Sequence, residues 1–125
     1  MIKVKIDTKE IFHVISLNET ELTANMAEEL AQIIAKLQKE DERSLVIDLK
    51  NVVKIDPEVI PVFMTLHNTT YQSRKSLVFC ELQSSVKPII FEGNDPELLN
   101  ITPTESEAWD IVQMEEIERE LDFEN

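Results

Sequence analysis

The sequence predicts an α/β protein with one mixed sheet of four to five strands and helices packed mainly on one face of that sheet. Three observations lead to this fold class. Apolar and charged residues alternate at the N-terminus, as they do in a half-buried strand. A second strand-like run is followed by an amphipathic helical pattern. Short apolar runs and helical patterns then alternate, which is typical of strands joined by helical crossovers.

The individual elements follow from these patterns. Ile2, Val4 and Ile6 mark the first strand by alternation, while denser apolar runs indicate the central strands. Two helices are expected to begin at capping residues, Asn25 and Thr104, because each has a glutamate three residues later. The expected order is strand 2–6, strand 11–17, helix 25–39, strand 44–49, helix 60–73, strand 76–82, short helix 84–91, a fifth strand near 98–101 and a helix from residue 104.

Length and composition predict a single cytoplasmic domain over residues 1–125. A chain of 125 residues is large enough to bury one core. No apolar run approaches the roughly 18 residues of a membrane span, and the N-terminus lacks the apolar centre of a signal peptide. The lone cysteine, Cys80, can form no internal disulfide, which fits a reducing compartment.

The net charge of −13 is concentrated in the last quarter of the chain. Residues 92–125 contain 12 of the 25 acidic residues and a single basic residue, Arg119. This charge repels phosphate backbones, so we expect no binding to nucleic acid. The acidic helix and tail, at about 104–125, are interpreted either as a solvated surface or as a face for a basic partner.

Candidate catalytic and metal-binding residues are few. Cys80 lies in an apolar strand, and His13 and His67 lack the spacing of metal ligands. Asp48 and Asp56, on either side of a strand end, leave a carboxylate pair open as an alternative. A chain with one glycine cannot build a phosphate-binding glycine loop. We therefore expect a protein that is not an enzyme and that uses neither a metal nor a cofactor.

Three stretches resemble a known family. They are SLVIDLKNVVKIDPEVIPVFMTL at 44–66, SLVFCELQSSVKPIIFEGND at 76–95 and LLNITPTESEAWDIV at 98–112. Together with the order of elements, they resemble the STAS domain, the sulfate-transporter and anti-sigma factor antagonist family. The resemblance covers nearly the whole chain and is strongest from Ser44 onward. It implies the STAS order β-β-α-β-α-β-α-β-α.

In the anti-sigma factor antagonists, a serine directly after the aspartate at a strand end is the phosphorylation switch. By resemblance, Asp56 matches that aspartate, and Pro57 occupies the phosphoserine position. Glu58 and Val59 stand where the family has a second serine and a glycine. Proline has no hydroxyl group, so we expect no phosphorylation at this site. Glu58 is interpreted as a helix-start acid favoured by the helix dipole, or as a fixed carboxylate that imitates phosphate.

The two prolines of this stretch predict a stiff loop. Pro57 suits the first turn of a helix, and Asp56 could cap that turn. Pro61 would remove an intrahelical hydrogen bond if the helix began at Pro57. We therefore expect a kinked first turn, or a helix that begins near Ile60.

The resemblance implies a regulatory domain that binds a protein partner, either an anti-sigma factor or a kinase-like regulator of transcription in bacteria. The alternative is an accessory STAS subunit that docks onto the ATPase of an ABC-type lipid transporter. A homodimer is also open, because the strand at 2–6 could pair with a second copy, although Lys3 and Lys5 are typical of a protected edge. The expected partner-binding residues are Asp56, Pro57, Glu58, Val59, Ile60, Pro61 and Phe63.

Overall fold

The structure is a computed structural model that describes residues 1–92 and 99–124. The elements in chain order are β1 (Val4–Thr8), β2 (Phe12–Leu17), β3 (Glu21–Leu22), α1 (Ala24–Glu40), β4 (Ser44–Asp48), β5 (Lys54–Ile55), α2 (Val59–Gln72), β6 (Leu77–Cys80), α3 (Lys87–Phe91), β7 (Asn100–Thr102) and α4 (Glu105–Glu124).

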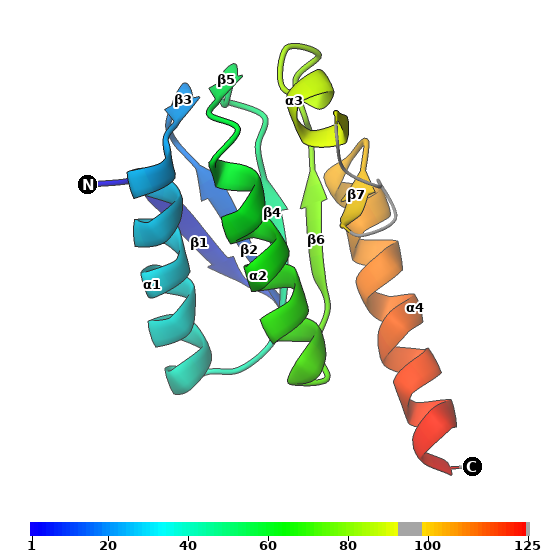
Figure 1. The fold of residues 1–125 in the computed structure, drawn as a ribbon. Coiled ribbons are helices and arrows are strands. Elements are labelled where there is room, and N and C mark those ends of the chain that lie inside the picture. The colour runs from blue at the N-terminus through cyan, green and yellow to red at the C-terminus, as the bar shows by residue number, and fades with distance from the viewer. Residues whose placement is uncertain (93–98, 125) are drawn as a thin grey trace.

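The main sheet has five strands in the order β1-β2-β4-β6-β7 (Figure 1). β1 and β2 form an antiparallel pair, and the remaining neighbours are parallel. A separate two-stranded sheet of β3 and β5 lies at the end of α1 and α2 where both helices begin. The predicted mixed sheet is confirmed. The small second sheet was not predicted, because strands of two residues carry no readable alternation.

The sheet separates two apolar clusters because successive side chains of a strand point to opposite faces. In β4, Leu45 and Ile47 belong to the larger cluster, which α1, α2 and α3 complete. Val46 belongs to the smaller cluster, which packs against Ala108 and Val112 of α4. In the described part of the chain, α1, α2 and α3 therefore cover one face, as expected, and α4 covers the other (Figure 1).

Two predicted caps differ in outcome. α1 begins after Thr23, whose Oγ1 accepts a hydrogen bond from the Met26 N–H at 3.2 Å, so the prediction of Asn25 as the cap is wrong. At α4, the Glu107 N–H donates to Thr104 Oγ1 at 3.2 Å, which confirms Thr104 as a cap. Both threonines satisfy a backbone donor that has no partner within its helix.

Candidate functional site

The loop between β5 and α2 contains the residues expected to bind a partner. Ile55 pairs with Leu22 in the small sheet, and the Asp56 N–H donates to the Leu22 carbonyl at 3.0 Å. Pro57 and Glu58 then form a turn and are exposed, whereas Asp56 is half-buried. The small sheet therefore holds the loop at the start of α2, where two of these residues face solvent.

The start of α2 differs from one of our expectations and agrees with another. The N-cap position is Glu58 and not Asp56, whose backbone carbonyl instead accepts a hydrogen bond from the Val59 N–H at 3.0 Å. The expected side-chain cap by Asp56 is thus wrong. α2 begins at Val59, one residue before the expected start at Ile60. Pro61 is consequently the third helical residue, where a backbone N–H would have no partner within the helix, and its ring is tolerated.

Three of the expected docking residues lie in the core. Val59 and Phe63 are fully buried and Ile60 is 5 % exposed. The Phe63 ring stacks on Phe79 of β6, with 4.4 Å between the ring centroids. These three side chains hold α2 on the sheet and offer no surface to a partner. The accessible part of the predicted site is therefore the exposed Pro57, Glu58 and Pro61 together with the half-buried Asp56.

Glu58 has αR dihedral angles, with φ −66° and ψ −12°, and its side chain makes no capping hydrogen bond. Its exposed carboxylate lies at the positive end of the α2 dipole. We predict that Glu58→Gln lowers the free energy of unfolding by about 0.3–1 kcal/mol at low salt, and that 1 M salt removes most of this difference. Urea denaturation at the two salt concentrations measures the effect. Equal stability of both proteins at low salt would refute the dipole interpretation.

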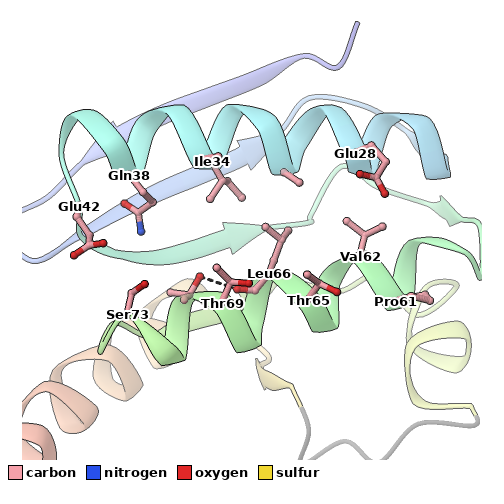
Figure 2. Close-up of a pocket in the computed structure, with 13 residues that line it drawn as sticks. Glu28, Ile34, Gln38, Glu42, Pro61, Val62, Thr65, Leu66, Thr69 and Ser73 are labelled. Atoms are coloured by element: carbon pink, nitrogen blue, oxygen red, sulfur yellow. Dashed lines mark hydrogen bonds between the residues drawn. The ribbon is translucent and has the colours of Figure 1, made fainter.

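A groove between α1 and α2 adjoins this loop (Figure 2). It has a volume of about 440 Å³, and Pro61 lies at one end of it. Ile34 of α1 and Val62 and Leu66 of α2 supply large apolar side chains to its lining. The lining residues are Glu28, Ala31, Ile34, Ala35, Gln38, Glu42, Pro61, Val62, Thr65, Leu66, Thr69, Thr70 and Ser73.

The groove was not predicted from the sequence. Its existence depends on Ala31 and Ala35, which lie four residues apart and therefore on one side of α1. Small side chains at these positions leave space between the two helices. The only sign of the groove in the sequence was the pair of alanines in the helical pattern. Such a pair does not show which neighbouring helix it faces.

Hydroxyl groups line the other side of the groove. Thr65 and Thr69 on α2 and Ser73 directly after it are exposed, whereas Thr70 is buried and its hydroxyl donates to the Leu66 carbonyl at 2.7 Å. The groove therefore combines an apolar floor with a polar edge. Such a surface can accept apolar side chains of a partner in its centre and hydrogen bonds at its rim.

Comparisons with known proteins agree on the fold. No family model matches the sequence, and no curated protein matches it. Among solved structures, a STAS domain protein from Planctomyces limnophilus, described as an anti-sigma factor antagonist, superposes with a TM-score of 0.69 at 17% identity, covering 86% of this chain and 95% of that one. This chain has the STAS fold. An RsbS variant from Moorella thermoacetica is similar to it with a TM-score of 0.71 at 17% identity, covering 89% of this chain and 95% of that one.

A third STAS-like neighbour is part of a transporter. The murine anion transporter Slc26a9 superposes with a TM-score of 0.66 at 18% identity, covering 82% of this chain but 18% of the transporter. The STAS fold thus occurs among these neighbours both in chains of similar length and as a segment of a much longer one.

The STAS sheet places the two aspartates of the carboxylate-pair alternative in different surroundings. Asp48 is 2% exposed at the end of β4, and its Oδ1 accepts the Lys50 N–H at 2.9 Å. Its Oδ2 lies 3.4 Å from Lys50 Nζ, and this carboxylate raises the pKa of Lys50. Asp56 instead belongs to the loop after β5. The Asp48 carboxylate is therefore already paired with a lysine.

The cysteine and His13 have structural surroundings, whereas the buried Nδ1 of His67 has no hydrogen-bond partner among the described residues. Cys80 is fully buried, and this burial, with the neighbouring Asp48 carboxylate, raises the pKa of its thiol. His13 is also fully buried: its Nε2 donates to the Asp41 carbonyl and its Nδ1 accepts from the Thr8 hydroxyl, both at 2.8 Å. Within residues 1–92 and 99–124, no three histidine, cysteine, aspartate or glutamate side chains are grouped as metal ligands would be.

Proposed function

We propose that this chain is a non-enzymatic regulatory STAS protein that binds a partner protein through one surface. That surface, the α2 docking surface, consists of Asp56, Pro57, Glu58 and Pro61 and the adjoining groove between α1 and α2. The supporting observation is that the exposed loop and the groove form one continuous surface, because Pro61 is exposed beside the loop and also lines the groove.

The chemistry of the surface favours a protein over a small molecule. A volume of about 440 Å³ is in the range of ligand pockets. The groove, however, is an open channel along two helices, and exposed prolines continue it on one side. A stiff loop beside an apolar channel loses little conformational entropy when a partner binds. Apolar side chains of the partner would fill the channel, while Glu58 and the hydroxyl groups of α2 would contact its polar rim.

The proposed partner, by resemblance, is an anti-sigma factor or a kinase-like regulator in the cytoplasm of a bacterium. Because Pro57 carries no hydroxyl group, a phosphate at the position of the family's serine cannot release this partner. Binding would then be controlled by the abundance or the state of the partner. Asp48 and Cys80 support a non-enzymatic role, since the first is paired with Lys50 and the second is a buried thiol with a raised pKa.

The alternative is an accessory subunit of a lipid transporter that docks onto its ATPase. The similarity to a segment of the Slc26a9 transporter favours a link to transport. No helix of the described residues is long and apolar enough to cross a membrane. An ATPase gene beside the gene for this chain would favour the alternative, and a gene for a sigma or an anti-sigma factor would favour the regulator.

A paired set of variants tests the α2 docking surface. Pro61→Arg combined with Thr65→Arg places two large cations at the groove, whereas Asn68→Arg combined with Gln72→Arg adds the same charge to exposed positions of α2 outside its lining. The wild-type chain is first used to capture a partner from native cell extract. We expect this partner to bind the purified groove variant at least about tenfold more weakly than the wild-type chain, because the variant loses one interface hot spot.

The control variant is expected to bind this partner with the affinity of the wild-type chain. Calorimetry with the purified partner measures both affinities, and urea denaturation verifies that both variants are folded. If the groove variant and the control variant bind equally well, the partner contacts another surface and the proposal is wrong.

A further inference from the structure

The second half of α4 carries an exposed apolar stripe. Met114, Ile117 and Leu121 are 49%, 58% and 55% exposed. Their spacing of three and four residues places them on one side of the helix. Large apolar side chains are rarely grouped on the solvent side of a helix unless that side binds something. The three residues are called the α4 stripe below.

The α4 stripe points away from the sheet. Ala108 and Val112 are the buried residues with which α4 contacts the sheet. Farther along the helix, Glu115 and Arg119 both bond to Ser76 Oγ, at 2.5 and 3.0 Å. At 100° per residue, these four side chains lie on the side of the helix opposite to the stripe. The stripe is thus not part of the core, and the end of α4 extends beyond the sheet (Figure 1).

Acidic residues border the α4 stripe on both sides. Asp110, Glu118 and Glu120 are exposed, and the helical period places each of them next to a stripe residue or between two of them. Arg119, the basic residue of α4, is turned toward the sheet, where it contacts Ser76 and Glu116. No basic side chain of α4 therefore compensates this rim. Lys9, which precedes β2, lines a hollow that Glu120 also lines, but its Nζ is paired with the Asp7 carboxylate at 3.1 Å.

We infer that the α4 stripe and its acidic rim bind a basic amphipathic helix of a partner protein. The apolar side of such a helix would cover the three stripe residues, and its lysines or arginines would meet the carboxylates at the rim. Charge excludes the other occupants. A second copy would bring a second set of carboxylates against the first, and a membrane surface rich in anionic lipids would repel the rim.

A hollow beside the stripe strengthens this inference. It has a volume of about 530 Å³ and lies between α4 and the start of β2. Ile117 lines it together with Phe12 and Trp109, whose rings meet edge to face with 5.2 Å between centroids. Ile117 therefore connects the stripe to a recess that can take a large apolar side chain of the partner. This surface lies on the opposite face of the sheet from the α2 docking surface, so either proposal can fail without the other.

Two synthetic peptides test the inference. Both have 18 residues with the same numbers of leucine and lysine, but in one the leucines recur at helical spacing and in the other they are spread around the helix. We expect the amphipathic peptide to bind the full chain at least about tenfold more tightly than its rearranged form in 0.15 M salt, measured by calorimetry. A third peptide, with glutamate in place of lysine, is expected not to bind.

Variants of the chain locate the binding. Met114→Gln, Ile117→Gln and Leu121→Gln together keep the charge and the helix propensity, and we expect them to weaken binding of the amphipathic peptide at least about tenfold. Tyr71→Ser, which removes a large exposed side chain (62% exposed) from α2, outside the stripe, should leave binding unchanged. Glu118→Lys with Glu120→Lys keeps the stripe, and it should weaken binding of the lysine peptide and allow the glutamate peptide to bind.

Three outcomes would overturn the inference. They are equal binding of the two lysine peptides, undiminished binding by the triple glutamine variant, and self-association of the chain that this triple variant abolishes. The first would indicate attraction by charge alone, the second would place the contact elsewhere, and the third would make a second copy the occupant.

Discussion

Phe63→Ala is expected to lower the free energy of unfolding by about 3–5 kcal/mol, the usual cost of deleting a large buried aromatic side chain. Phe63 is fully buried, with a relative exposure of 0%. Its ring stacks on Phe79, with 4.4 Å between the ring centroids. The substitution removes both the buried area and this ring contact, and it leaves a cavity between α2 and β6. Urea denaturation followed by far-UV circular dichroism measures the loss.

Thr65→Ala is the matched control, because Thr65 is exposed two residues farther along the same helix. It is expected to change stability by less than about 0.5 kcal/mol. Phe63→Leu keeps most of the buried volume and should cost clearly less than the alanine variant. A Phe63→Ala protein as stable as the control would show that this side chain is not in the core and would restore it as a docking residue.

Stability is expected to fall by about 2 kcal/mol between pH 7 and pH 10 because of one thiol. Burial raises the pKa of Cys80 in the folded chain. In the unfolded chain the thiol loses its proton above about pH 8.5. The folded state therefore binds more protons in this range, so the stabilising contribution is complete below about pH 8.5 and falls by about 1.4 kcal/mol per pH unit above it.

Cys80→Ala provides the control, since alanine does not titrate. We expect its unfolding free energy to be nearly independent of pH over the same range, whatever its absolute stability. Lys50, whose pKa the Asp48 carboxylate raises, contributes stability that is lost only above its unfolded value of about 10.4, and its exposed side chain weakens that effect. Parallel pH profiles for wild type and Cys80→Ala would show that the thiol is not responsible.

The order of strands and helices was predictable because it depends on local patterns. The alternation at the N-terminus and the dense apolar run of β4 mark strands whatever their neighbours are. Thr104 with Glu107 likewise marks the start of α4 from four residues of sequence. The same rule failed at Asn25, because Thr23, two residues earlier, was an equally good capping residue. The fifth strand is β7, and Leu98, which we included in it, lies outside the described residues.

The candidate site was only partly predictable. The sequence placed a loop at Asp56 and the two prolines, at a strand end before a helix, and the structure has a loop there. It did not separate Pro61, which is exposed, from Ile60 and Phe63, which are buried. That separation depends on the rotation of α2 about its axis, and packing against β6 sets this rotation. The groove depends in addition on how α1 lies beside α2.

Local residue patterns were thus enough to establish the α/β class, the position of the loop at Asp56 and the absence of a hydroxyl group at Pro57. Long-range packing established which side of each helix faces the solvent. It buries Phe63 in the core, forms a groove beside Ala31 and Ala35, and places the α4 stripe outside the core. The reason is physical: a hydrophobic pattern shows that a side chain can be buried, but its burial requires a partner surface that only the folded chain supplies.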